Sequence, residues 1–117
     1  MAQLIKLIMN RNQKQDLYDR LIRELPGIER KGRTIPYNSV KGHMFTLVTK
    51  EGDIGIRLPR EEREKFLDKF KTGPIVSYGT LMKEYVKVPE QMLFDLDSLK
   101  KYVEISHAYA SSLKPKK

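Results

Sequence analysis

The chain has 117 residues, of which 39% are hydrophobic and 32% charged, and a formal net charge of +8. This length predicts one domain with a single hydrophobic core. The chain has no cysteine, which excludes disulfides, thiol nucleophiles and thiolate metal sites. It has no apolar run near the roughly 20 residues of a membrane helix and no signal-peptide pattern at its start. We therefore expect a cytoplasmic protein with no membrane partner.

The positive charge is unevenly distributed along the chain. Residues 1–50 hold ten Lys/Arg and four Asp/Glu, residues 51–100 hold nine and ten, and residues 101–117 hold four and one. A basic excess favours anionic partners such as nucleic acid. The alternative is that the charge serves solubility, with Lys114, Lys116 and Lys117 forming a solvated tail.

The segment before the first helix is rich in large apolar side chains. Within it, Leu4, Ile5 and Ile8 are candidates for self-association, and we expect a homodimer. The sequence leaves four alternatives for this segment: an extra helical turn, a strand, an arm that binds another chain, or packing on its own domain. We accordingly divide the chain into an apolar arm over 1–12, a single domain over 13–113 and a basic tail over 114–117.

The first helix is predicted over residues 13–25. Large apolar side chains recur there at helical spacing, with Asn12 as the expected N-cap and Pro26-Gly27 as the stop. A strand is predicted over 33–40, and Pro36 places it at a sheet edge or a bulge because proline has no N–H for the ladder.

Residues 42–59 predict a β-hairpin around a turn at 51–53. The alternating residues are Phe45, Leu47 and Thr49 against Met44, Thr46 and Val48, then Ile54, Ile56 and Leu58 against Gly55 and Arg57. Such alternation is typical of a sheet with one buried face and one solvent-exposed face.

The second half of the chain predicts a helix over 60–74, short strands over 75–78 and 81–89, and a closing helix over 96–113. The helix over 60–74 has acidic residues in its first turn and basic residues in its last, which suits the helix dipole. The complete order is helix, three strands, helix, two strands, helix. It predicts an α+β two-layer sandwich with a mainly antiparallel sheet, covered by the first and last helices.

Two stretches of sequence resemble a known family. They read HMFTLVTKEGDIGIRLP (43–59) and MKEYVKVPEQMLFDLDSLKKYVEISHAY (82–109). Over residues 14–113 the chain resembles the TfoX N-terminal domain family, and more distantly the YjbR (MmcQ-type) family. It departs from the pattern at the first strand, where RTIPYNSVKG stands in place of a Gly-rich turn. The resemblance implies an α+β sandwich without established catalysis and a regulatory role, and YjbR-type proteins are often described as DNA-binding.

No catalytic or cofactor motif is present in the sequence. The two histidines, His43 and His107, form no HExxH pair, no serine lies in a GxSxG elbow, and no glycine pattern fits a nucleotide loop. Glu61, Glu62 and Glu64 alternate with basic residues, which is typical of a solvated helix face. We therefore expect neither an enzyme nor a cofactor or metal site.

The densest basic group away from the tail consists of Arg30, Lys31, Arg33 and Lys41, and Tyr37 lies among them. These five residues are the candidate nucleic-acid contacts. Tyr37, Tyr78 and Tyr85 fall on predicted strands, where they either stack on bases or pack within the domain. We expect a small non-enzymatic regulatory or interaction module. Nucleic-acid binding, favoured by the charge, and protein binding or homo-oligomerisation, favoured by the apolar segment, both stay open.

Overall fold

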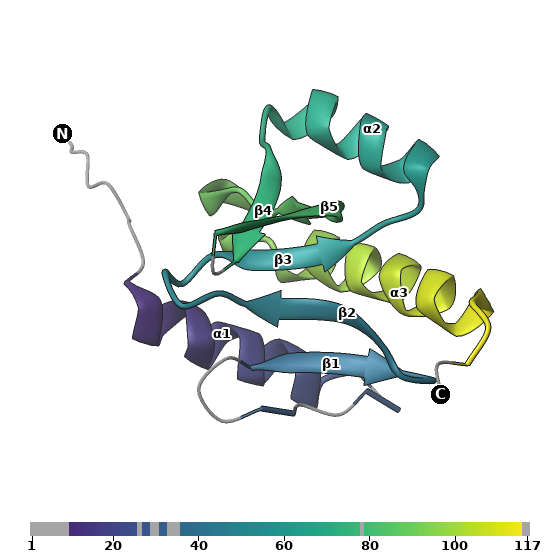
Figure 1. The fold of residues 1–117 in the computed structure, drawn as a ribbon. Coiled ribbons are helices and arrows are strands. Elements are labelled where there is room, and N and C mark those ends of the chain that lie inside the picture. The colour runs from purple at the N-terminus through teal and green to yellow at the C-terminus, as the bar shows by residue number, and fades with distance from the viewer. Residues whose placement is uncertain (1–9, 26, 29–30, 33–35, 78, 116–117) are drawn as a thin grey trace, which may run out of the picture.

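The computed structural model describes residues 10–25, 27–28, 31–32, 36–77 and 79–115. These residues form three α-helices, one 3-10 helix and one five-stranded sheet (Figure 1). In chain order the elements are α1 (Arg11–Arg23), β1 (Tyr37–Val40), β2 (His43–Val48), β3 (Ile54–Arg57), α2 (Arg60–Phe70), β4 (Pro74–Ser77), β5 (Thr80–Lys87), the 3-10 helix η1 (Glu90–Phe94) and α3 (Leu96–Ser112). The predicted α+β class and order of helices and strands are confirmed, while η1 has no counterpart in the prediction.

The sheet has the strand order β1-β2-β3-β5-β4, and each neighbouring pair is antiparallel. Helices α1 and α3 cover one face, here called the helix face (Figure 1). Lys100 of α3 reaches Glu24 at the end of α1 with an N–O distance of 2.5 Å. The buried side chains of these helices and of the sheet form one core cluster, which includes Tyr18, Leu21, Ile22, Val48, Ile54, Ile56, Val86, Leu99 and Val103. The first and last helices thus cover the apolar face, as the sequence predicts.

Helix α1 begins at Arg11, before the predicted start, and its N-cap is Asn10 instead of Asn12. The Asn10 side chain accepts a hydrogen bond of 2.8 Å from the Gln13 N–H, and the Gln13 side chain accepts one of 2.9 Å from the Asn10 N–H. This capping box satisfies amide groups that a helix start leaves unpaired. The apolar spacing identifies the buried face of a helix and not its first turn, so the prediction of Asn12 is wrong.

The first strand, β1, begins directly after Pro36, at the edge of the sheet that the sequence predicts. The Pro36 carbonyl accepts a hydrogen bond of 2.9 Å from the Val48 N–H, so the proline still contributes its acceptor to the ladder. The remaining predicted part of this strand, residues 33–35, lies outside the described residues.

A β-bulge interrupts β2. Asn38 of β1 pairs with Thr46, but the next residue, Ser39, pairs with Met44. Phe45 is therefore an extra residue on β2, and two residues of one strand oppose a single residue of its partner. The regular alternation predicted for this strand is wrong at that point, because a bulge changes the face that the following side chains reach.

The bulge directs two consecutive side chains toward the helices. The Phe45 ring meets the His107 ring of α3 edge-on, with centroids 5.3 Å apart. Thr46 Oγ1 lies 2.8 Å from the Tyr18 hydroxyl of α1. Leu47, predicted to share a face with Phe45, packs instead in a second cluster on the opposite side of the sheet. Because of the one inserted residue, this short strand contributes side chains to the clusters on both faces of the sheet.

The face opposite the helices, here called the hairpin face, is covered at its centre by Ile75 of the β4–β5 hairpin. Pro74 pairs with Val86, whereas Ile75 pairs with Met82, so residues 83–85 of β5 have no partner on β4. This irregularity lets the hairpin turn over the sheet. Ile75 is fully buried there, in the second cluster with Leu47 and Tyr85.

Gly55 of β3 permits this crossing. A β-carbon added to Gly55 would lie 2.7 Å from Ile75 Cγ1, closer than real β-carbon contacts, and 3.0 Å from Leu47 Cδ2, tighter than most of them. Glycine within a strand often marks such an approach of one backbone to another segment. We predicted that this face of the sheet is exposed to solvent, and that prediction is wrong at the centre of the face. The alternation within residues 42–59 does not indicate that a second hairpin, β4–β5, packs over it.

Helix α2 ends at Phe70, ahead of the predicted Gly73-Pro74 stop, with Lys71 in the left-handed conformation at φ 51°. Phe66 is buried, and its ring centroid lies 4.9 Å from that of Tyr102 on α3. Aromatic packing thus attaches α2 to the end of the helix layer.

Helix α3 begins after Asp95, whose side chain accepts from the Ser98 N–H at 3.3 Å. Its buried stripe consists of Leu99, Val103, Ser106 and Ala110, as the helical spacing predicts. The Ser106 hydroxyl donates a hydrogen bond of 3.0 Å to the carbonyl of Phe45. The helix is therefore joined to the bulge itself.

Replacement of Leu99 tests the helix-face core. Leu99 has no exposed surface and lies in one cluster with Ile54 and Val86. We expect Leu99→Ala to lower the free energy of unfolding in urea by about 2–5 kcal/mol, because it leaves a cavity. Lys101→Ala, at an exposed position of the same helix, is the control and should change it by about 0.5 kcal/mol or less. A loss below about 1 kcal/mol for Leu99→Ala would contradict this packing.

Replacement of Gly55 tests the crossing of β4 over β3. We expect Gly55→Ala to destabilise the protein by about 1–3 kcal/mol, since the new methyl group overlaps Ile75. The matched control is Gly73→Ala, where an added β-carbon meets no atom within 4 Å. The cost of Gly55→Ala should shrink in an Ile75→Ala background, as measured by a double-mutant cycle. Equal costs in both backgrounds would mean that the two residues are not in contact.

Candidate functional site

The described nucleic-acid candidates lie along β1 and in the turn after it. Lys31 exchanges backbone hydrogen bonds of 2.7 and 3.0 Å with Tyr37, and its ammonium group donates to Ser39 Oγ at 2.9 Å. Ser39 pairs with Met44, whose side chain packs in the second cluster. Because paired residues point to the same face, the Lys31 ammonium group lies at the hairpin face.

The tyrosines weighed as a stacking platform are packed within the domain. Tyr85 is 7% exposed in the second cluster, and Tyr37 is half-buried against the same cluster. Tyr78 lies outside the described residues. Five other candidate residues are also outside them, namely Arg30, Arg33, Leu4, Ile5 and Ile8. In the described part of the chain, the structure therefore shows no exposed row of rings like that of an RNA-binding sheet.

Lys41 joins the β1–β2 turn to the end of α3. Its backbone is left-handed, with φ 53°, and its ammonium group donates to the Ser111 carbonyl at 2.8 Å. The last carbonyls of a helix carry partial negative charge, so a lysine there is favourable. Beside it, His43 Nε2 lies 2.6 Å from the Lys114 carbonyl. These two contacts bring the end of α3 and Lys114 to this end of the sheet.

An open pocket of about 450 Å³ lies at this end of the sheet. The start of β2, the end of β3 and the middle of β5 line it, through His43, Met44, Arg57, Met82, Lys83, Glu84 and Tyr85. Met44 and Met82 are half-buried against the second cluster. The pocket thus combines an apolar floor with charged side chains.

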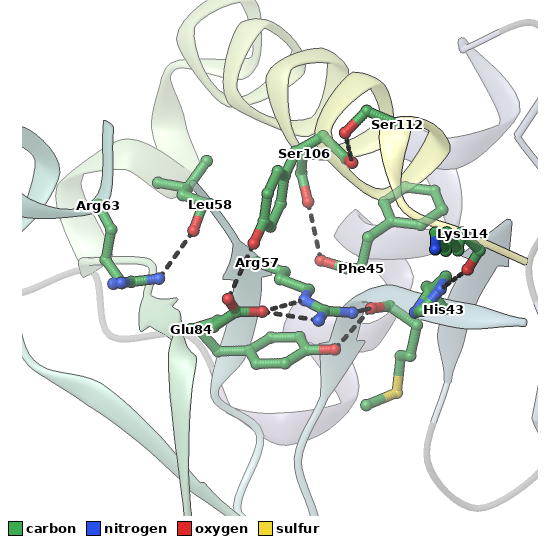
Figure 2. A network of polar contacts seen from close by, with 12 residues as sticks. His43, Phe45, Arg57, Leu58, Arg63, Glu84, Ser106, Ser112 and Lys114 are labelled. Carbon is green, nitrogen blue, oxygen red and sulfur yellow. Dashed lines mark hydrogen bonds and ion pairs between the residues drawn. The ribbon is translucent and has the colours of Figure 1, made fainter. Parts of the chain in front are cut away.

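Arg57 organises the polar side of the pocket (Figure 2). Its Nε and Nη2 lie 2.7 and 2.6 Å from Glu84 Oε1, and its Nη1 donates to the Met44 carbonyl at 3.4 Å. The Tyr85 hydroxyl donates to the same carbonyl at 2.6 Å. The Tyr109 hydroxyl donates to Glu84 Oε2 at 2.8 Å, and its ring lies 5.7 Å from Arg57 Cζ. The network ties β2, β3, β5 and α3 together.

This network fixes the protonation of its members. Burial raises the pKa of Glu84, but hydrogen bonds from Tyr109 and Arg57 and the positive charge of Arg57 together lower it more, so the net pKa is below its ordinary value. Burial raises the pKa of Tyr85 to about 12. Burial and the hydrogen bond to Glu84 raise the pKa of Tyr109. Near neutral pH both tyrosines are therefore donors and Glu84 is an anion.

The histidines form no group with other metal-binding side chains. His43 turns toward Lys114 (Figure 2), and His107 packs against Phe45. In the described segments, no cluster of three or more His, Cys, Asp or Glu could hold a metal ion. Over the same segments, none of the helices has the length and apolar character to cross a membrane.

Four lysines from separate segments lie in the pocket or next to residues that line it, and we call them the basic rim: Lys31, Lys41, Lys83 and Lys114. Lys83 lines the pocket directly, and Lys31 donates to Ser39, the strand partner of the lining residue Met44. Lys41 precedes the lining residue His43 by two positions and donates to the end of α3, and the Lys114 carbonyl contacts His43. All four are exposed. Among the described residues that line the pocket, Glu84 is the single carboxylate, and its charge is paired with Arg57. The rim is therefore a positively charged surface.

The sequence interpretation missed most of the pocket. It selected Lys31, Tyr37 and Lys41, which the fold brings near it, but neither Arg57 nor Lys83. Arg57 ends a strand of apolar residues, and its partner across the sheet is Tyr85. An arginine at the end of an otherwise apolar strand could have indicated a polar site in the sequence. No local pattern predicts that β5 bends and brings Lys83 to the start of β2.

The lowered pKa of Glu84 predicts a pH-dependent contribution to stability. A folded pKa below the unfolded value stabilises the protein above the unfolded pKa, near 4.5, and the contribution is lost as pH falls through the folded pKa. We expect Glu84→Gln to destabilise the protein at about pH 7 by an amount on the order of 1 kcal/mol, because the partly exposed pair is screened. The difference from the unmodified protein should shrink below about pH 4.

The matched control is Glu64→Gln, which removes an exposed helix ion pair with Arg60 and should have the smaller effect at pH 7. Urea unfolding from pH 3 to pH 7 measures both variants. A Glu84→Gln effect that stays constant or grows in acid would contradict the assigned role of the ion pair.

Comparison of the chain with protein-family models, with curated proteins and with solved structures gives no match. The resemblance to the TfoX N-terminal domain family stays a prediction from the sequence.

Proposed function

We propose that this protein is a small, non-enzymatic, cytoplasmic regulatory module of the TfoX N-terminal-like type that binds nucleic acid through the basic rim. The observation that carries the proposal is that Lys83 lines the pocket and that Lys31, Lys41 and Lys114 lie next to its lining residues Met44 and His43. They come from the segment before β1, the β1–β2 turn, β5 and the residues after α3.

The hydrogen bonds of the rim leave its charge available. Lys31 donates to a serine hydroxyl and Lys41 to a backbone carbonyl, and both acceptors are neutral. Elsewhere, Lys14 and Lys100 lie against glutamates, which cancel their charge. Exposed lysines held by neutral acceptors can exchange those bonds for phosphate oxygens. Phosphate contacts of this kind supply most of the non-specific affinity for nucleic acid, through counterion release.

Homo-oligomerisation is the second candidate function. Val76 and Leu81 pair across the β4–β5 hairpin and are 52% and 50% exposed. They lie on β4, an edge strand, and on its partner. An exposed edge with apolar side chains is a template for pairing with another chain. Light scattering on the full chain and on a version starting at Asn10 would show whether the N-terminal segment takes part.

A salt titration tests the proposed function. We expect a mixed-sequence oligonucleotide to bind at low salt, with log K falling linearly as log salt rises. The triple variant Lys31→Gln, Lys41→Gln, Lys83→Gln should bind more weakly and reduce the magnitude of that slope by about 2–3, because each lost phosphate contact contributes about 0.7–0.9. Fluorescence anisotropy measures both quantities.

The control is a triple glutamine variant with the same net charge, made at three exposed lysines of α2 and α3: Lys65, Lys69 and Lys101. It should keep most of the slope. Absence of binding at low salt, or equal losses in the two variants, would contradict binding at the rim.

A further inference from the structure

We propose that the pocket inside the basic rim accepts one unpaired base, so that the protein prefers single-stranded nucleic acid to a duplex. This inference rests on the proposed function and adds the class of ligand. Met44 and Met82 stand on an apolar floor that includes Tyr85, and Lys83 stands at the mouth of the same pocket. A flat aromatic group attached to an anion matches this combination.

The size and shape of the pocket favour a single base. Its volume of about 450 Å³ lies within the range of about 300–1,000 Å³ typical of small-ligand sites. A duplex keeps its bases inside the stack, and a protein usually reads them by inserting a helix or ribbon into a groove. Here Lys83 lines an open pocket instead. A base can enter a hollow when it is unpaired and turned out of the stack.

The contacts inside the pocket favour stacking over hydrogen-bonded reading of the base. The hydroxyl of Tyr85 is used on the Met44 carbonyl, and Arg57 is used on Glu84 and on that carbonyl. The thioethers of Met44 and Met82 supply polarisable surface that adapts to rings of different shape. Contact between thioethers and the face of a ring is not specific for one base. The site should therefore discriminate by strandedness more than by sequence.

The lysines are placed for the phosphates on either side of such a base. Lys83 is the neighbour of Met82 in β5 and is exposed. Lys31 lies toward β1, on the other side of Met44, where it donates to Ser39. A strand that crosses the pocket from β5 to β1 would meet a cation before and after the inserted base. Charge and apolar surface thus alternate along the path, as in other single-strand sites.

The experiment compares a single-stranded oligonucleotide carrying one 2-aminopurine with the duplex that it forms with its complement. Anisotropy at equal salt should show the single strand binding about tenfold more tightly, as expected when methionine contacts with a base are added to phosphate contacts. The 2-aminopurine fluorescence should change on binding of the single strand. Met82→Ala should remove the fluorescence change and most of the preference, while the duplex affinity stays unchanged.

The matched control is Leu81→Ala, the preceding residue of β5, which is 50% exposed and does not line the pocket. It should leave the preference intact. Since Met82→Ala could loosen the hairpin, the comparison of single strand and duplex on the unmodified protein is decisive without it. Equal affinities with no fluorescence change would overturn this inference and leave the proposed function standing. Absence of binding by either form would overturn both.

Discussion

The extra residue at Phe45 in β2 determines where the neighbouring side chains lie. Without it, Phe45 and Leu47 would share one face of the sheet. With it, Phe45 meets α3 and Thr46 meets α1, while Met44 and Leu47 reach the hairpin face. The backbone at the bulge is also used, because the Phe45 carbonyl accepts from Ser106. A bulge leaves part of the ladder unpaired, and here α3 supplies one of the missing partners.

The same bulge creates the conditions for the pocket. The Met44 carbonyl is satisfied by the side chains of Arg57 and Tyr85. Glu84 and Tyr109 then hold Arg57 in place. On the hairpin face, Gly55 lets Ile75 cross closely, so that the hairpin bends and brings Met82 beside Met44. An apolar floor with charged side chains beside it thus follows from two local departures from regular strand geometry, a bulge and a glycine. Functional sites are often built where strand pairing is irregular.

The helices and their order could be predicted because their signals are periodic and local. The stripe from Leu99 to Ala110 and the hairpin around residues 51–53 need no knowledge of the rest of the chain. The faces of β2 and the covering of Gly55 could not be predicted in this way. A bulge in β2 depends on the residues of the partner strand β1. One of these residues, Asn38, is buried and hydrogen-bonded to Tyr18, which lies 20 residues earlier in the sequence. Of the candidate site, the charge near β1 was visible in the sequence, but Arg57, Lys83 and the methionines meet only after folding.

The position of the bulge is tested most directly by nuclear Overhauser measurements on the folded protein. The account predicts cross-peaks between the ring protons of Phe45 and His107, and between the Met44 side chain and the Tyr85 ring. Cross-peaks from the Phe45 ring to Leu47 and Ile75, with none to His107, would show a regular strand. They would contradict both the separation of the two clusters and the assignment of Met44 to the pocket.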